Sequence, residues 1–502
     1  MRKKVIIIGG GLSGFTTGIY LQANGYDTEI VEKNAVSGGA CIGWERKGCY
    51  IDGCIHWMTG VNPKTAEYGL WRDIHALKED TEIFFQRDFA HFDCGEGKSL
   101  TIWGDLEELQ AELLAFAPED EKEIKRFCRL IKRFQRIVPP ISRPADMMSL
   151  GELLKIGLTM AGDYYWITKT SKLSCADYAK RFKNKALCEC IENYMAPGYN
   201  FMSLLYMLAH VTGKNGGIPI GGSLPLMQRV EKRYLDLGGK LRLNAEADEV
   251  CIERDHARGV RLKNGEILYA DWVVSATPVE HSLKKLLGGR YESKKFDKYL
   301  KDRENYPIYT YSTVVFKCAQ DLSSLPLSLH ADKPTPFVLD REYKGVTFRN
   351  YSYDKTMKTP EGACVVQASI RGNDGMYFWW KDKKTAGNYR EEKKKFGEEM
   401  LAFAEEYFPD LKGKIEVIDV VTPCTYERYL HSRHGCFQSF VQTATGKAIM
   451  EKGVVKGLKN FLLSGQWLLR CGGLPPAAIT GKFAAQRICK ADKKKFVYPE
   501  RN

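Results

Sequence analysis

Lys4-Val5-Ile6-Ile7-Ile8-Gly9-Gly10-Gly11-Leu12-Ser13-Gly14 is the stretch that decides the fold of this 502-residue chain. Its β-branched run predicts a strand, and the glycines that follow, Gly9, Gly11 and Gly14, have the spacing G-x-G-x-x-G. A helix-compatible segment comes next, and Glu32 ends the following apolar run, about 20 positions after the first glycine. Strand, glycine turn, helix and acidic residue together predict a dinucleotide-binding unit.

Each glycine of this unit has a separate expected role. Gly9 allows the tight turn out of the strand, Gly11 lets the backbone approach a pyrophosphate, and Gly14 lets the helix, expected over residues 15–24, pack closely on the sheet. The N–H groups at the start of that helix can bind the phosphates, and Glu32 can accept hydrogen bonds from ribose hydroxyls. The expected binding residues of this unit are Gly9, Gly11, Leu12, Ser13, Gly14, Glu32 and Lys33.

A second glycine pair, in Ser37-Gly38-Gly39-Ala40, follows the acidic residue closely, and residues 48–57 read Gly-Cys-Tyr-Ile-Asp-Gly-Cys-Ile-His-Trp. Flavoproteins often have such a pair, because FAD continues past its ribose and needs close backbone approach. With these motifs the sequence resembles the FAD-dependent amine oxidase superfamily. Within that superfamily it is most similar to the phytoene desaturase, carotenoid isomerase and retinol saturase branch. The resemblance implies FAD as the cofactor, contacted by Gly38, Gly39, Ala40 and His56.

The resemblance continues along nearly the whole chain. It includes a glycine-rich turn at residues 217–223, strands at 247–252 and 270–276, and a C-terminal flavin motif at 460–477. In three places this chain departs from the family pattern: Gln466 replaces a frequent acidic residue, Cys54 replaces a glycine, and Cys471 and Pro476 replace glycines. The further FAD contacts that the resemblance implies are Val250, Ala276, Gly465, Gln466, Gly473, Leu474 and Pro475.

The motifs of one FAD site are spread over the chain, so the cofactor domain has to be assembled from separated segments. We therefore predict an α/β fold, with a Rossmann-like FAD-binding domain and an interleaved α+β substrate domain. The expected FAD-binding segments are residues 1–100, 211–285 and 430–495, the expected helical region facing substrate or membrane is 101–210, and the expected substrate-binding domain is 286–429.

Apolar residues recur at helical spacing within the expected helical region. The pattern predicts helices over residues 107–116, 119–138 and 150–161, and Tyr164-Tyr165-Trp166 follows the last of them. The helix over 150–161 is the most apolar of the three. It could lie in a membrane interface, line an apolar tunnel or simply pack against the cofactor domain.

Composition limits the partners and the compartment. The chain is 44% hydrophobic, as globular proteins are, and no apolar run is long enough to span a membrane. The net charge of +13 comes from scattered lysine runs, which are either a solvated surface or an attraction to anionic lipid headgroups. Nucleic acid is not expected as a partner, and neither is a metal, since the closest cysteine pair is a lone C-x-C at 188–190. Fifteen cysteines without a targeting segment predict a cytoplasmic location, with membrane association as an addition to it.

No nucleophile with an adjacent base can be read from the sequence, so the flavin itself is the expected reactive group. His56 is the best polar candidate for a general acid or base, or for orienting the substrate, and the alternative is a structural histidine. Tyr426 and Arg428 are weaker catalytic candidates. A helix beginning near Ala477 is expected to direct its N-terminus at the flavin pyrimidine and to stabilise the reduced ring.

The leading hypothesis is an FAD-dependent oxidoreductase, a desaturase or saturase, that acts on carbon–carbon bonds of a long apolar, polyene- or isoprenoid-like molecule. One alternative is a redox-neutral double-bond isomerase or hydratase that uses reduced FAD. Another is a non-catalytic escort protein that binds prenylated partners. An apolar small molecule and a membrane surface are the expected partners, and the sequence leaves the electron donor or acceptor open.

Overall fold

A five-stranded parallel sheet is assembled from segments that lie far apart in the sequence. The computed structural model describes residues 2–137, 141–331 and 333–501. The strand order is β10-β2-β1-β14-β20, and every neighbouring pair is parallel. Because both faces of this sheet are covered, β1 is an almost continuous apolar run and is buried along most of its length. The strands are β1 (Lys4–Ile8), β2 (Asp27–Val31), β10 (Lys240–Arg242), β14 (Trp272–Ser275) and β20 (Phe461–Leu463).

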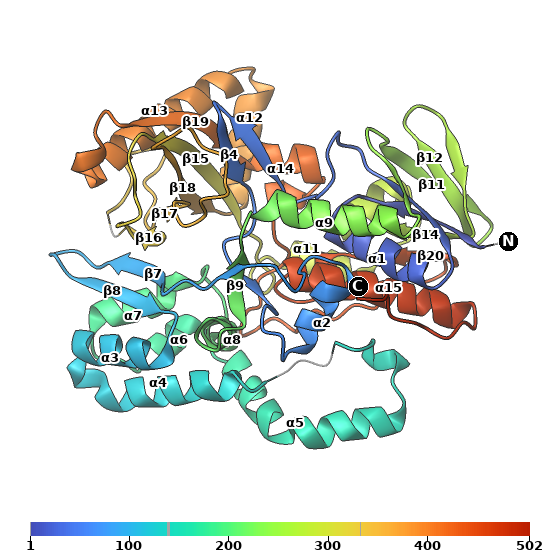
Figure 1. Ribbon diagram of the computed structural model, residues 1–502, viewed down its shortest axis with the longest axis horizontal. Helices are drawn as coiled ribbons and strands as arrows, with labels where there is room; N and C mark the ends of the chain where they lie inside the picture. Colours follow the sequence, from blue (N-terminus) through green and yellow to red (C-terminus); the bar gives the residue numbers. More distant parts are fainter. Residues whose placement is uncertain (1, 138–140, 332, 502) are drawn as a thin grey trace.

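Three helices pack together beside this sheet: α1 (Leu12–Ala23), α9 (Ser223–Asp236) and α15 (Leu474–Ala491). In Figure 1 they lie side by side between the sheet and the centre of the molecule. The first helix begins three residues earlier than expected, directly after Gly11. The last begins at Leu474 and not near Ala477, because the two prolines that follow Leu474 suit the first turn of a helix.

A second, seven-stranded sheet has the order β19-β15-β18-β17-β16-β7-β8. Most of it comes from residues 310–421. Two of its strands come from the N-terminal part of the chain: β7 lies before the expected domain boundary at residue 100, and β8 spans that boundary. They join this sheet because β7 pairs in parallel with β16, while Phe89 and Leu100 bury the hairpin against the helical region. The strands are β7 (Asp88–Asp93), β8 (Ser99–Trp103), β15 (Thr310–Cys318), β16 (Ser328–His330), β17 (Thr347–Asn350), β18 (Cys364–Gly372) and β19 (Ile415–Val421).

The segment from residue 106 to residue 212 is mostly helical, as predicted. Its helices are α3 (Leu106–Phe116), α4 (Glu121–Phe134), α5 (Leu150–Ser171), α6 (Cys175–Ala179), α7 (Lys185–Tyr194) and α8 (Phe201–Thr212). The expected end of the second helix at residue 138 lies outside the described residues. The third continues ten residues beyond the expected end and includes the Tyr-Tyr-Trp segment. Figure 1 shows α5 at the lower edge of the molecule, apart from both sheets.

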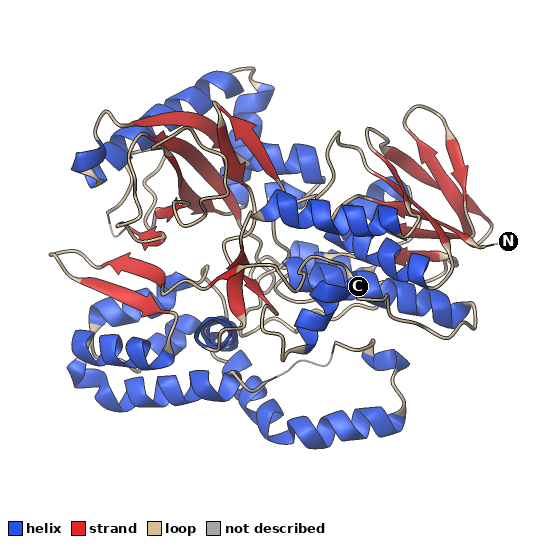
Figure 2. Cartoon of the chain, viewed as in Figure 1, coloured by secondary structure: helices blue, strands red, loops and turns tan. Residues whose placement is uncertain are grey.

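Smaller elements connect these layers, and Figure 2 shows the strands grouped into separate sheets with helices around them. No helix of the described residues is both long and apolar enough to cross a membrane. The remaining strands are β3 (Gly43–Arg46), β4 (Cys49–Asp52), β5 (Met58–Thr59), β6 (Ile83–Phe84), β9 (Gly216–Pro219), β11 (Ala247–Glu253), β12 (His256–Leu262) and β13 (Ile267–Tyr269). The remaining helices are α2 (Ala66–Asp73), α10 (Val279–His281), α11 (Lys294–Lys301), α12 (Asp374–Thr385), α13 (Tyr389–Tyr407) and α14 (Pro423–Leu430).

Candidate active site

A cavity of about 1220 Å³ lies where the two sheets and the helical region meet. Its walls come from the carboxyl end of the parallel sheet, from α5, α7 and α8, and from one face of the seven-stranded sheet. Cavities for small ligands are ordinarily about 300–1,000 Å³. The space is therefore large enough to hold a dinucleotide and a second molecule.

The glycine turn after β1 forms one end of this cavity. Gly9 and Gly11 line it, and the second glycine pair lies directly beside them, because Gly38 donates from its N–H to the carbonyl of Gly10 at 2.8 Å. A Cβ on Gly11 would meet nothing closer than the Cα of Gly39 at 3.8 Å, so the space in front of this turn is open. Gly14 does not line the cavity. A Cβ there would overlap the carbonyl oxygen of Gly9, so its role is close packing of α1.

Glu32 and the start of α1 provide the polar groups at this end. Glu32 is buried, and its carboxylate accepts from the N–H of Gly10 and from the N–H of Asn34, both at 2.8 Å. The N-terminus of α1 has no side-chain cap, and the hydroxyl of Ser13, which lines the cavity, has no hydrogen-bond partner. Uncapped N–H groups and an unpaired hydroxyl fit the phosphates of a dinucleotide, and a buried carboxylate fits its ribose. Two other predicted residues, Leu12 and Lys33, line the cavity here.

The turn before α15 forms a second polar wall of the same cavity. Gly465, Gln466, Gly473, Leu474 and Pro475 all line it, as do Gly38, Gly39, Ala40 and Ala276. The N-terminus of α15 begins at this wall without a side-chain cap. Its free N–H groups and positive dipole end fit the electron-rich pyrimidine part of a flavin. The residues present therefore fit FAD at both ends.

Val250 does not lie at the site, and this prediction is corrected. It is buried in a hydrophobic cluster, opposite Val260 of the neighbouring strand β12. Ala247, at the start of the same strand, lines the cavity instead. Only the beginning of β11 reaches the cofactor end, because the strand then runs away from it into the β11–β12–β13 sheet.

His56 lines the cavity, and one hydrogen bond determines which of its ring nitrogens carries the proton. Its Nδ1 lies 3.0 Å from the carbonyl oxygen of Cys54, which can only accept, so Nδ1 carries the proton and Nε2 is left as an acceptor. Burial, together with the positive charge of Arg349, lowers the pKa of His56 well below its ordinary value. The ring is therefore neutral, which suits it to orient a substrate rather than to act as a general acid.

Asp52 holds the loop that carries His56. The carboxylate accepts from the N–H of Cys54 at 2.9 Å and from the hydroxyl of Ser223 at 2.6 Å, and it does not line the cavity. Burial raises the pKa of this carboxyl. Asp52 therefore positions the loop between the first glycine motif and the helical region.

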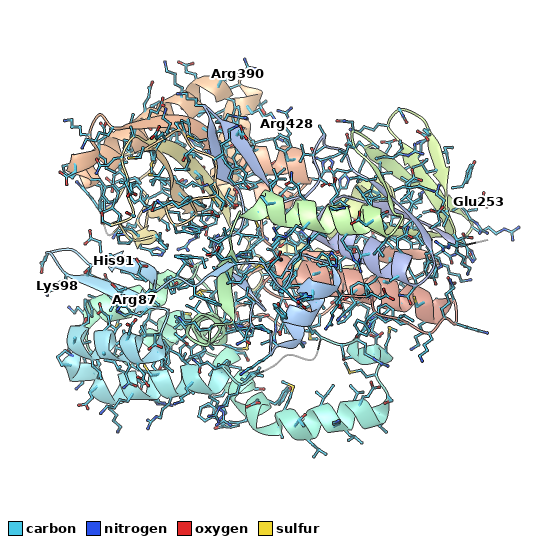
Figure 3. All side chains as sticks on the ribbon, in the orientation of Figure 1. Arg87, His91, Lys98, Glu253, Arg390 and Arg428 are labelled. Carbon is cyan, nitrogen blue, oxygen red and sulfur yellow. The ribbon has the colours of Figure 1, made fainter. Side chains whose placement is uncertain are left out.

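The two weaker catalytic candidates have different positions. Tyr426 lines the cavity, and burial raises the pKa of its phenol, so it stays protonated. Arg428 is exposed on α14, where Figure 3 labels it near the outer surface, and it does not line the cavity. Its carbonyl accepts from the Lys33 ammonium at 2.6 Å, so it contributes backbone and not a catalytic guanidinium. The reason is helical geometry, since residues two apart on a helix face different sides.

The seven-stranded sheet contributes a polar wall that was not predicted from the sequence. Thr347 and Arg349 of β17 and Gln367, Ser369 and Arg371 of β18 line the cavity, as does His330 of β16. Their strands alternate, with Phe348, Val366, Ala368 and Ile370 turned to the opposite, buried face. This alternation is visible in the sequence, but a polar strand face ordinarily faces water and so gives no signal of a site.

Comparisons with known proteins agree with this geometry. The pattern of the NAD(P)-binding Rossmann-like domain matches residues 7–74. The chain is 27% identical over 301 residues to a lycopene-forming phytoene desaturase of Pseudescherichia vulneris, covering 57% of this chain and 58% of that protein. It is 22% identical to the chloroplastic prolycopene isomerase of Daucus carota, covering 86% of this chain and 71% of that protein. A solved structure of a putrescine oxidase variant matches with a TM-score of 0.62 at 13% identity, covering 98% of this chain and 99% of that one.

These comparisons confirm two predictions. The resemblance that the motifs indicated is present, and the α/β fold with a Rossmann-like unit is shared across almost the whole chain. The chain spans less than two thirds of the length of the desaturase that it matches.

Proposed function

We propose that this chain is an FAD-dependent oxidoreductase that acts on carbon–carbon bonds of a long apolar, polyene- or isoprenoid-like substrate. The single observation that carries the proposal is the continuous cavity, which joins a dinucleotide-binding end to a space enclosed by apolar side chains. The similarity to a phytoene desaturase and a prolycopene isomerase supports the same substrate class.

FAD would be held at both polar walls described above. Glu32 would bind a ribose, the turn at Gly11 and the N-terminus of α1 the pyrophosphate, and the turn at Gly473 the flavin ring. When bound, FAD supplies a hydride acceptor or donor, and so the protein needs no nucleophile of its own.

The protein's own residues bind and shield the substrate. Apolar side chains of the helical region enclose the far part of the cavity and exclude water from the reacting carbons. They are Phe134, Met160, Ile167, Met202 and Met207. Neutral His56 offers a hydrogen-bond acceptor at Nε2 and protonated Tyr426 offers a donor. The two side chains can orient a substrate, and neither is a strong acid or base.

We also propose that the protein takes its substrate from a membrane surface through α5. One face of this helix lines the cavity with Met160 and Ile167. The opposite face is unusually exposed: Leu150, Leu154 and Leu158 are 74%, 59% and 80% exposed. These leucines recur every four residues and so form one apolar stripe along the helix. Lys155 lies beside the stripe and is exposed, and the net charge of the chain is +13.

Such a helix suits the interface of an anionic bilayer, where the stripe enters the acyl boundary and the lysines face the headgroups. The 15 cysteines of the chain suit a reducing compartment, which supports a cytoplasmic location for this membrane-associated protein.

A second candidate function is a redox-neutral double-bond isomerisation. The prolycopene isomerase is similar over 86% of this chain, but at 22% identity against 27% for the phytoene desaturase, so the oxidoreductase remains the favoured function. Both functions use the same cavity and the same cofactor, and they differ in whether the product gains or loses hydrogen.

The test is an anaerobic incubation of the FAD-loaded protein with a panel of polyenes, with and without dithionite. A product two mass units away from the substrate, formed as the flavin changes redox state, supports the oxidoreductase. A product of unchanged mass that needs reduced flavin supports the isomerase. Protein that is colourless and does not bind added FAD would favour the non-catalytic escort function and would overturn both.

A further inference from the structure

Two arginines lie on the cavity wall formed by the seven-stranded sheet. Arg349 comes from β17 and Arg371 from the adjacent strand β18, and both are partly buried. Strand alternation turns both toward the cavity: Arg349 pairs with Gln367, and Arg371 lies four residues further along β18 on the same face. Both arginines line the cavity and lie on the sheet face opposite to the one that packs against the buried cluster of Phe348 and Ile370.

Neither guanidinium has an anionic partner. Within residues 2–137, 141–331 and 333–501, neither Arg349 nor Arg371 makes an ion pair or a side-chain hydrogen bond. Arg371 lies over the ring of Tyr309, 5.9 Å from its centroid, and that contact supplies no counter-charge. A charge that is partly withdrawn from water is stabilised by a counter-charge, so two unpaired arginines in one cavity are free to bind an anion from outside the chain.

Two carboxylates, Asp93 and Glu189, also line the cavity, but within the described residues neither forms an ion pair with Arg349 or Arg371. His330 lies opposite Thr347 on the adjacent strand, and its Nδ1 is 3.3 Å from the Thr347 hydroxyl, within hydrogen-bond distance. Burial and the charges of both arginines lower the pKa of His330 to about 3, so the ring stays neutral. The amide of Gln367 is occupied, because it donates to the carbonyl of Asp52 at 2.7 Å. His330 and Gln367 are thus neutral and carry no counter-charge.

The cofactor has its own anion site elsewhere in the cavity. The uncapped N-terminus of α1, the glycine turns and Ser13 are at the end of the parallel sheet. A third arginine that lines the cavity, Arg470, lies two residues before Gly472 in the turn at the cofactor end. Arg349 and Arg371 are on the seven-stranded sheet, and so they are available to bind the substrate.

We infer that the substrate is an apolar chain ending in an anionic group, a carboxylate or a phosphate, and that Arg349 and Arg371 bind this group. The planar guanidinium matches both oxyanions in paired hydrogen bonds. The chain would extend from this wall toward the apolar side chains of the helical region, which brings it past the cofactor end. This inference rests on the proposed function only in taking the apolar space as the substrate's.

The experiment compares molecules that share a chain and differ in the head group. Binding of retinoic acid and retinol to the FAD-loaded protein is measured by quenching of tryptophan fluorescence, and farnesyl diphosphate and farnesol form a second pair. We expect at least one acid to bind about tenfold to hundredfold more tightly than its alcohol, the range for a charge-assisted hydrogen bond. The pair with the larger ratio distinguishes a carboxylate from a phosphate.

The variants are Arg349→Gln, Arg371→Gln and the double substitution, with Arg390→Gln as the matched control. Arg390 is exposed on α13 and labelled at the outer surface in Figure 3. The double variant should bind acid and alcohol equally, having lost affinity for the acid alone, and Arg349→Lys should retain part of the preference. The control should behave as the wild type.

Equal affinity of the wild type for acid and alcohol in both pairs would overturn the inference, and this comparison needs no variant to fold. A preference for the acid that persists in the double variant would also overturn it. Loss of FAD from that variant would assign the arginines to the cofactor and reject the inference as well. The proposed function is tested separately by the flavin content and the product mass, so acid binding by a flavin-free protein would reject that function alone.

Discussion

Gln466 accepts a hydrogen bond from the N–H of Gly473 at 2.8 Å, and its amide donates to the carbonyl of Phe437 at 2.9 Å. One side chain thus uses both ends of its amide to fix the turn from which α15 begins. The family that the sequence resembles often has an acidic residue at this position. Glutamate could accept from Gly473, but it could not donate to Phe437, so the neutral amide is what this loop arrangement requires.

The substitution Gln466→Glu should therefore lower the free energy of unfolding by about 1–3 kcal/mol, because it leaves the Phe437 carbonyl unpaired beside a negative charge. Urea denaturation of the two proteins measures the difference. Gln110→Glu on α3 makes the same change of charge away from this turn and serves as the control. Equal stability of the two variants would contradict the prediction.

Substitutions of Gly11 and Gly14 should distinguish an effect on FAD binding from an effect on folding. Gly11→Ala should leave the fold intact, because its Cβ meets no atom closer than 3.8 Å, and should weaken FAD binding by about 1–3 kcal/mol through crowding of the pyrophosphate. Gly14→Ala should destabilise the protein itself, because its Cβ overlaps the Gly9 carbonyl. Thermal unfolding and flavin titration of both variants distinguish these outcomes. Identical behaviour of the pair would show that the assigned roles are wrong.

Glu32→Ala should weaken FAD binding by roughly 1–3 kcal/mol, because the ribose loses its acceptor and the N–H of Gly10 loses its partner. Titration with FAD, followed by quenching of flavin fluorescence, measures the change. Glu253→Ala, at an exposed position of β11, is the control. Unchanged affinity in Glu32→Ala would mean that the ribose lies elsewhere.

Stability should fall as the pH drops below about 6.5. Burial lowers the pKa of His210 to about 4 and that of His281 to about 3, whereas the unfolded chain titrates near 6.5. The unfolded state then binds more protons than the folded state, so the stability present at neutral pH is lost on acidification, by at most about 1.4 kcal/mol per pH unit for each such histidine.

Urea denaturation at pH 7 and pH 5.5 measures this slope. His210 is the best probe, because Asn215 donates to its Nδ1 at 2.8 Å and so fixes the neutral ring. His210→Gln should have a shallower pH dependence than the wild type, whatever its absolute stability. A slope that is flat in the wild type, or unchanged in the variant, would contradict the assignment.

Leu154→Glu combined with Leu158→Glu should reduce binding to anionic liposomes and lower turnover, while the flavin spectrum stays unchanged. Both leucines are mostly exposed, so the substitutions place charge in the membrane contact without disturbing the core. Leu235→Glu on α9, at a leucine that is 43% exposed, is the matched control. Loss of flavin or unfolding of the double variant would show that α5 is a core helix.

Binding of the wild type should also be reversed by high salt, because attraction between exposed lysines and headgroups is screened. Salt-insensitive liposome binding would leave the apolar stripe as the sole contact and would contradict the electrostatic part of the proposal.

The cofactor end could be predicted from the sequence because its signal is local. Gly9, Gly11 and Glu32 lie within a single βαβ unit, and their spacing alone determines where they meet. Val250 was misplaced because β11 reaches the cavity only at its first residue, and a strand pattern does not tell which end points at a ligand.

The polar wall on the seven-stranded sheet could not be predicted in this way. Arg349 and Arg371 face the cavity only because β7 and β16 pair across more than 200 residues and bring the sheet over the helical region. The sequence contains no pattern that shows which distant strands pair. A strand with one polar face is ordinarily predicted to expose that face to solvent. Arg428 was misplaced for a related reason, since which face of α14 turns inward depends on its tertiary contacts.

The packing of α15 against α1 also constrains how the protein is made. The two helices contact each other closely, yet they are separated by about 450 residues of chain, which a ribosome takes roughly 20 to 90 seconds to synthesise. During that interval the face of α1 that Gly481 later covers is exposed, and β14 lacks its neighbour β20. The parallel sheet and the helices beside it can therefore be completed only after α15 has been synthesised.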